Sequence, residues 1–574
     1  MKEELRRTVP ISERKYLLAN VLYIFAILVT CSIAIYLGFL QFRGPEVKPL
    51  QANAEQFSAE RALQYLENFA ISPHPVGSPE HERVRDYLVN ALEELGLSPE
   101  IQTAADSLFS WGEPFNGIVE NILARIPGHN SSQAIMLTAH YDSEHNSPGA
   151  ADDGAAVAAI LETVRILQEG EPLKNDVIIL LSDGEELGLL GAQAFVNEHP
   201  WVHDIGIVLN FEARGSEGPS VLFETNDHNE RLIEEFAKGS SHPIAHSFIA
   251  DLYRMLPNET DLTLYKSHGM YGLNFAFFEG IYGYHSPEDS IENLSIKSLQ
   301  HHGENMLDLV HHFGNMELEA KEDGSSLFFN LFAKKVVFYG KQYVIPFMIA
   351  AIFLFILTCV HGIRKREMAT ARILFGFLFC VVSVAISYFA AEGLLKLFSA
   401  LTGYDLWSIG AYPKLSNPLF ISILFMIAAL LTGAYSFILG AVKGLNFFMG
   451  SLFGWLILIV ASSFLYQDSS YIFVWPYLFA LIGVNVFLRI KNSIMEKVVP
   501  LTIIIFSFLF ITPIMYLVYV LLTIHYIGAL AAAFALCLVF IIPALSQIRR
   551  RYLSIFPAIL LLSGVLPLLL VWSH

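Results

Sequence analysis

Seven residues between positions 140 and 285 are of types that bind a divalent metal ion or work beside one. They occur in five short segments: Thr-Ala-His140-Tyr-Asp, Pro-Gly-Ala-Ala-Asp152-Asp-Gly, Ser-Asp-Gly-Glu185-Glu186, Leu-Asn-Phe-Glu212-Ala and Gly-Tyr284-His285-Ser-Pro. Zinc in proteins takes imidazole and carboxylate ligands of this kind. Two ions bridged by one carboxylate activate a water and polarise a carbonyl together. The segments therefore predict a two-metal hydrolytic site.

Three of these residues, taken singly, have a simpler explanation. A histidine after a strand, such as His140, is more often structural, and Asp152 before a helix is typical of an N-cap. His285 in a turn suits a solvated loop. The adjacent pair Glu185-Glu186 is harder to explain, because neighbouring carboxylates repel unless a cation or a proton separates them. The five segments together, in this order, favour the metal site.

The elements that must position these residues follow from hydrophobic patterning. Apolar runs predict strands at 134–138, 177–181, 205–211 and 273–278, and helical spacing predicts helices at 154–168, 187–197 and 296–312. Continuous apolar strands that alternate with helices are typical of a mostly parallel sheet covered on both faces. Sites in such sheets form beyond the carboxyl ends of the strands. The sequence thus predicts an α/β domain with a mostly parallel central sheet and the site at one edge.

The chain as a whole is too apolar for an ordinary soluble protein. Its 574 residues are 54% hydrophobic, with a mean hydropathy of +0.48. Residues 17–40 are long enough to span a bilayer and predict an uncleaved signal anchor. Eight further spans are expected at 343–361, 371–394, 418–440, 445–466, 471–489, 498–523, 526–546 and 553–572. The net charge of −18 argues against nucleic-acid binding, since phosphate backbones need basic surfaces.

Basic residues between the spans predict the orientation in the membrane. They gather in the loops on the side of the N-terminus: Arg364, Lys365, Arg366, Lys443, Arg489, Lys491, Lys497, Arg549, Arg550 and Arg551. By the positive-inside rule this side is cytoplasmic. The globular domain is therefore expected outside the cytoplasm, in a bacterial periplasm or in the lumen of an organelle.

Composition divides the chain into six segments. We expect a cytoplasmic N-terminus at 1–16, a transmembrane anchor at 17–40 and a linker at 41–58. An extracytoplasmic globular domain follows at 59–315, then a second linker at 316–342 and an all-α domain of eight spans at 343–574. The lipid bilayer is thus a predicted partner.

The order of the five metal-site segments resembles that of the co-catalytic zinc aminopeptidases and carboxypeptidases, a family that includes bacterial leucyl aminopeptidase. The resemblance covers about residues 59–315 and includes the lead-in Ser-Pro-His-Pro-Val-Gly-Ser at 72–78. One anchor, one peptidase domain and eight spans resemble the multi-pass membrane branch of this family, that of the endoplasmic reticulum metallopeptidases and the fungal vacuolar membrane proteases. The globular domain is accordingly expected to be a zinc peptidase domain.

This resemblance implies a role for each of the seven residues in a site with two Zn²⁺ ions. The implied ligands are His140 and Glu212 for one ion, Glu186 and His285 for the other, and Asp152 as the bridge. Glu185 would be the general base on a zinc-bound water, and Tyr284 would stabilise the oxyanion. The peptide bond between Asp152 and Asp153 would be cis. Glu212 departs from the family pattern, because many members have Asp at this position.

The predicted function is a membrane-anchored di-zinc metallo-exopeptidase that acts on a peptide substrate, and an aminopeptidase in preference to a carboxypeptidase. Two alternatives stay open. One is a glutaminyl cyclase-like acyltransferase with a single zinc ion, and the other is a scaffold or transport protein with an inactive peptidase domain. The sequence specifies neither the peptide nor the oligomeric state.

Overall fold

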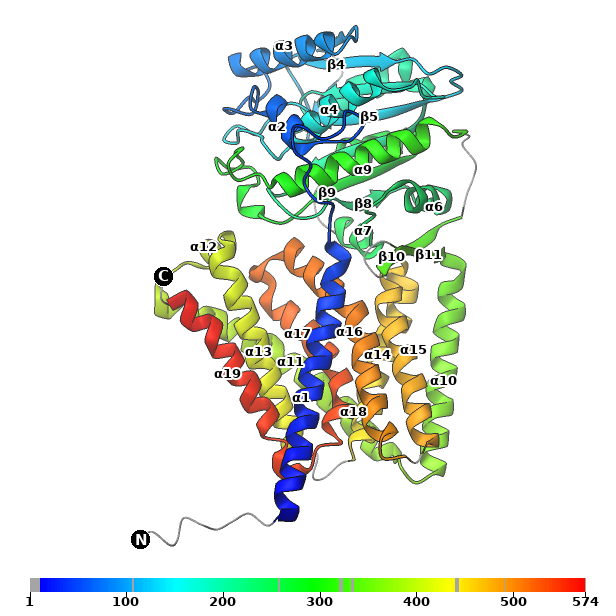
Figure 1. Ribbon diagram of the computed structural model, residues 1–574, viewed down its shortest axis with the longest axis vertical. Helices are drawn as coiled ribbons and strands as arrows, with labels where there is room; N and C mark the ends of the chain where they lie inside the picture. The colour runs from blue at the N-terminus through cyan, green and yellow to red at the C-terminus, as the bar shows by residue number, and fades with distance from the viewer. Residues whose placement is uncertain are drawn as a thin grey trace. The chain divides into compact units, whose positions relative to one another are not determined.

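The computed structural model describes residues 11–105, 108–255, 259–318, 324–331, 335–438, 443–490 and 492–572. The chain divides into two compact units (Figure 1). The globular unit is Gln41–Lys341, and the helical unit combines the residues up to Leu40 with the chain from Gln342 onward.

A seven-stranded sheet with strand order β1-β4-β6-β5-β7-β9-β8 forms the centre of the globular unit. Its strands are β1 (Glu100–Ala104), β4 (Val119–Ile126), β5 (Ala134–His140), β6 (Val177–Ser182), β7 (Ile205–Ala213), β8 (Val221–Thr225) and β9 (Gly272–Phe277). The neighbours β6, β5, β7 and β9 run parallel, as the apolar runs predict. The antiparallel strands β1, β4 and β8 are additional. The sequence signal for β4 is weak because Glu120, Asn121 and Arg125 interrupt its apolar run.

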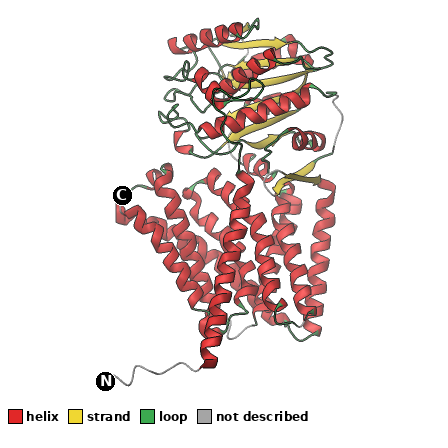
Figure 2. Cartoon of the chain, viewed as in Figure 1, coloured by secondary structure: helices red, strands yellow, loops and turns green. Residues whose placement is uncertain are grey.

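Helices cover both faces of this sheet (Figure 2). One face packs against α2 (Ala59–Leu66), α3 (Pro79–Glu94), α4 (Gly154–Glu169) and α9 (Ile296–Gly314), and the other against α5 (Leu190–Glu198) and α8 (Asp261–Ser267). Alternation along β5 produces the two cores, because successive side chains of a strand point to opposite faces. Ile135 and Leu137 belong to the core under α4 and α9, whereas Met136 belongs to the core under α5 and α8. The helices α6 (Glu230–Gly239) and α7 (Phe248–Tyr253) complete the unit.

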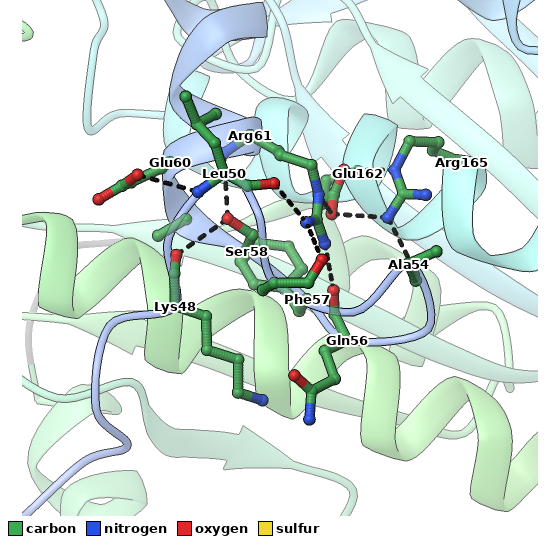
Figure 3. A network of polar contacts seen from close by, with 12 residues as sticks. Lys48, Leu50, Ala54, Gln56, Phe57, Ser58, Glu60, Arg61, Glu162 and Arg165 are labelled. Carbon is green, nitrogen blue, oxygen red and sulfur yellow. Dashed lines mark hydrogen bonds and ion pairs between the residues drawn. The ribbon is translucent and has the colours of Figure 1, made fainter.

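The segment 41–58, which composition predicts to be a linker, is fastened to the globular unit by polar contacts (Figure 3). Arg61 donates to the carbonyl of Leu50 at 3.0 Å and forms an ion pair with the fully buried Glu162 at 2.7 Å. Arg165 binds the second carboxylate oxygen of Glu162 at 2.9 Å. These two arginines also donate hydrogen bonds to other backbone carbonyls of the segment. The polar segment 41–58 is therefore bound to the rest of the globular unit, and we call it the strap.

The region 316–342, also expected to be a linker, contains a hairpin of β10 (Ser326–Leu331) and β11 (Lys335–Gly340). Leu327, Phe328 and Phe329 of this hairpin are buried. The aromatic and β-branched residues of β10 and β11 favour strands. Because the hairpin is close in sequence to an apolar span, composition alone does not reveal it as a separate element.

Among the described residues of the whole chain, nine helical segments are long and apolar enough to cross a membrane. They are Lys15–Phe42, Lys341–Arg364, Thr370–Thr402, Pro413–Ile438, Gly444–Leu465, Gln467–Arg489, Met495–Leu522, Ile524–Leu545 and Arg550–Leu568. The helices in these segments are α1 (Ile11–Phe39), α10 (Val344–Arg364), α11 (Thr370–Thr402), α13 (Pro413–Ile438), α14 (Gly444–Leu465), α15 (Ser470–Arg489), α16 (Met495–Leu522), α17 (Ile527–Leu538) with α18 (Ile542–Leu545), and α19 (Ile555–Trp572). The helix α12 (Leu406–Ala411) is short and is not one of the nine. Number and positions agree with the sequence prediction. The chain is a multi-pass membrane protein.

Candidate metal centre

Three predicted ligands meet beyond the carboxyl ends of two parallel strands. His140 is the last residue of β5, Glu212 lies near the end of the adjacent β7, and Asp152 lies in the loop before α4. His140 Nε2 is 3.2 Å from Asp152 Oδ1 and 3.8 Å from Glu212 Oε2. The donor atoms of these residues all lie within 4.8 Å of one another. They form the first donor group.

A second donor group contains Glu186, His285 and the same Asp152. Glu186 follows β6, and His285 comes from the loop after β9. His285 Nε2 is 3.2 Å from Glu186 Oε1 and also 3.2 Å from Asp152 Oδ2. Asp152 therefore presents one carboxylate oxygen to each group. The peptide bond from Asp152 to Asp153 is cis, as the family resemblance implies.

The spacing of the donors fits a metal ion. A tetrahedral zinc ion with bonds of about 2.0–2.1 Å holds its ligand atoms roughly 3.4 Å apart, and the measured separations run from 3.2 to 3.8 Å. Glu186 Oε1 and His285 Nε2 are buried without a hydrogen-bond partner among the described residues, although they converge on each other. A cation between them would satisfy both atoms.

The electrostatics of the two groups also call for a cation. Burial, and then the charge of Asp152, raises the pKa of Glu212 to about 8 and that of Glu186 to about 7. Burial also disfavours the charged form of Asp152, but the neighbouring imidazoles of His140 and His285 outweigh this effect and lower the pKa of Asp152 to about 2. A bound divalent ion reverses the effect of burial on its ligands and holds all three carboxylates ionised. Imidazole and carboxylate donors together suit zinc.

Glu185 lies beside both donor groups and belongs to neither. Burial raises its pKa well above the ordinary value. The charges of Glu212 and Glu186 raise it further, while that of His140 opposes the rise. Glu185 is therefore close enough to both donor groups for their charges to affect its pKa.

Tyr284 marks the open side of the site. Its ring stacks on that of His285, with ring centroids 3.7 Å apart. The side chain of His285 is 35% exposed, whereas that of His140 is 1% exposed. A substrate would therefore enter from the side of Tyr284 and His285.

Two further carboxylates position the site, and sequence reasoning does not include them in it. Asp142 accepts hydrogen bonds from the backbone N–H groups of Glu185 at 3.1 Å and Glu186 at 3.3 Å. Asp289 accepts one from the N–H of Asp152 at 3.2 Å. The position of Asp142, two residues after His140, could have indicated that it belongs to the site. Asp289 contacts a loop 137 residues away in sequence, so no local pattern indicates its role.

Residues 121–310 match the family model described as Peptidase family M28. These residues lie within the globular unit, which thus contains a domain similar to the M28 metallopeptidases, here named the M28 domain. The chain is 35% identical over 262 residues to the vacuolar membrane protease of Candida dubliniensis, and this match covers 44% of this chain and 28% of that protein. It is 29% identical over 310 residues to endoplasmic reticulum metallopeptidase 1 of Mus musculus, over 50% of this chain and 34% of that protein. The chain thus matches between 28% and 34% of the length of these two relatives.

Solved structures similar to the M28 domain include an aminopeptidase from Aneurinibacillus sp. strain AM-1, with 14% identity over 47% of this chain and 98% of that chain and a TM-score of 0.39. A glutaminyl cyclase from Porphyromonas gingivalis has 19% identity over 44% of this chain and 98% of that chain, with a TM-score of 0.36.

Proposed function

We propose that this protein is a membrane-anchored exopeptidase that uses two zinc ions to hydrolyse a peptide bond at a chain terminus, as an aminopeptidase in preference to a carboxypeptidase. The observation that supports this best is the position of Asp152, which faces both donor groups with one oxygen each. A shared carboxylate is the bridge that two adjacent ions need. His140 and Glu212 would complete the ligands of one ion, and Glu186 and His285 those of the other.

Bound zinc would lower the pKa of a water and polarise the scissile carbonyl. The protein's own groups then move the protons. Glu185, which lies beside both donor groups, accepts the proton of the attacking water at its carboxylate and passes it to the nitrogen of the leaving amine. Tyr284 donates a hydrogen bond to the developing oxyanion from the open side of the site. The net reaction adds one water across the peptide bond.

Asp142 is a positioning residue in this scheme. It holds the backbone N–H groups of Glu185 and Glu186, so it orients the base and a ligand at the same time. Residues that orient a metal ligand in this way typically contribute roughly 10–100-fold to activity or metal affinity.

In the membrane, the N-terminus would be cytoplasmic and the M28 domain would face the other side. The basic loops that support this orientation include Arg364, and the M28 domain exposes Lys297 on α9. In sealed membrane vesicles with the cytoplasmic face outward, an impermeant maleimide should label Arg364→Cys at once and Lys297→Cys only after detergent is added. Labelling of Lys297→Cys alone before detergent is added would contradict this orientation.

The proposed activity is tested by Glu185→Gln in the full-length protein loaded with zinc. We expect hydrolysis of N-terminal amino-acid amides to fall by about 10²–10⁴-fold, while the zinc content stays equal to that of the wild type. Asp142→Asn is the matched control and should lose less activity. Full activity in Glu185→Gln would exclude Glu185 as the base.

The same assay separates the two alternatives. Ring closure of peptides with N-terminal glutamine, with one zinc ion per chain, would indicate a glutaminyl cyclase. Absence of zinc and of any turnover, together with unchanged function of Glu185→Gln in cells, would indicate a scaffold.

A further inference from the structure

Arg214 is a cationic residue close to the candidate site that the proposed mechanism does not use. It comes two residues after Glu212, and its backbone N–H still donates to the carbonyl of Phe277 in β9 at 3.0 Å. Side chains two residues apart on a strand share a face. Asn210 and Glu212 illustrate this on β7, since their side chains hydrogen-bond at 3.1 Å. Arg214 therefore leaves the strand on the same face as the ligand Glu212.

Arg214 also lies next to the loop that forms the open side of the site. Phe277, whose carbonyl accepts the hydrogen bond from the Arg214 backbone, is the last residue of β9. The loop that follows β9 carries Tyr284 and His285. Arg214 therefore lies at the start of the loop beside which a substrate would enter.

Among the described residues, Arg214 has no carboxylate partner of the kind that most other arginines of the globular unit have. Its Nε is buried, and no described residue accepts a hydrogen bond from that atom. Elsewhere in the unit, arginines form ion pairs with carboxylates: Arg43–Glu46, Arg61–Glu162, Arg83–Glu80, Arg85–Glu120, Arg125–Asp176, Arg165–Glu162 and Arg254–Asp251. A buried N–H without an acceptor is destabilising, so a ligand that supplies an acceptor would be bound there favourably.

We propose that Arg214 binds a carboxylate of the substrate, so that the enzyme prefers peptides with a carboxylate on the residue next to the scissile bond. This inference rests on the proposed exopeptidase function and specifies its substrate class. Guanidinium groups bind carboxylates through two parallel hydrogen bonds. The many acidic side chains of the site would otherwise repel a carboxylate. The group is either the free terminus of a dipeptide or an acidic side chain, which have the same chemistry.

The test uses the full-length, zinc-loaded protein and two matched substrate pairs. Leucyl-leucine against its amide tests the terminal carboxylate, and leucyl-glutamate amide against leucyl-glutamine amide tests the side chain. In at least one pair, wild-type kcat/KM should be about tenfold or more higher for the carboxylate. Arg214→Gln should lower kcat/KM for the carboxylate member and so remove this preference. Arg214→Lys should keep part of it, and Arg43→Gln, which changes an exposed arginine, should keep all of it.

A binding measurement separates this inference from the proposed activity. In the Glu185→Gln background, titration calorimetry should show tighter binding of the carboxylate member, and adding Arg214→Gln should equalise the pair. Preference that survives Arg214→Gln, or a wild type without preference, would overturn the role of Arg214 even if hydrolysis is confirmed. Absent hydrolysis with an Arg214-dependent binding preference would overturn the exopeptidase proposal and leave the carboxylate site standing.

Discussion

Two of the places where the globular unit buries charge differ in what balances that charge. In the strap cluster, defined as Arg61, Glu162 and Arg165, one fully buried carboxylate lies between two guanidinium groups (Figure 3). The candidate metal centre has no such internal balance. Its carboxylates face two histidines, and the atoms Glu186 Oε1 and His285 Nε2 have no hydrogen-bond partner among the described residues.

This difference distinguishes structural charge from functional charge. A buried ion pair that satisfies itself fastens one segment to another, and here it holds the strap to α2 and α4. A buried cluster with excess negative charge stays folded only with a proton or a cation. Spacing alone does not separate the two kinds, but the partners of each polar atom do.

The largest predicted effect is at Asp152, which only the metal centre contains. Asp152→Ala removes a donor from both groups, so we expect zinc binding to be lost and activity to fall by far more than the roughly 10–100-fold expected for a supporting residue. Zinc analysis and peptide hydrolysis measure both. Retained activity near that of Asp142→Asn would show that Asp152 is not a shared ligand.

The strap cluster should respond in stability and not in metal binding. Glu162→Gln removes the buried counter-charge of Arg61 and leaves Arg165 with the more exposed Glu169, and breaking a buried pair in this way destabilises by about 3–5 kcal/mol. Thermal or denaturant unfolding of the full-length protein measures the loss, and its zinc content should be unchanged. A loss of zinc would mean that the strap and the site are coupled.

Removing the metal should destabilise the globular unit, because the candidate metal centre would lose its bound ions. A ligand that binds only the folded state stabilises it by about 2.7 kcal/mol when its free concentration is 100 times the dissociation constant. Chelation should therefore lower the melting temperature of the wild type. It should leave that of Asp152→Ala unchanged, and an equal shift in both would point to zinc elsewhere.

A smaller effect concerns buried histidines that carry no charge. Burial lowers the pKa of His302 to about 3, below its ordinary value of 6.5. Between these two pH values the unfolded chain binds more protons than the folded one, so stability is complete above about pH 6.5 and falls as the pH drops. This histidine contributes about 1.4 kcal/mol per pH unit over that range. Unfolding at pH 7.5 and 5.5 should show a weaker dependence in His302→Gln, and an identical dependence would contradict the assignment.

Local signals were sufficient for the parts of this molecule that are contiguous in sequence. The continuous apolar runs predict the four parallel strands, and strand ends predict where His140 and Glu212 lie. The nine spans follow from length and apolarity. The docked strap and Asp289 depend on side chains that meet across more than 100 residues, and no local pattern encodes such a meeting.

Whether two zinc ions share Asp152 is tested most simply by counting zinc in the purified full-length protein. We expect two zinc ions per chain in the wild type, and one in each of His140→Ala and His285→Ala, because each variant damages one donor group and leaves the other. A single zinc ion in the wild type, or the same count in all three proteins, would contradict it.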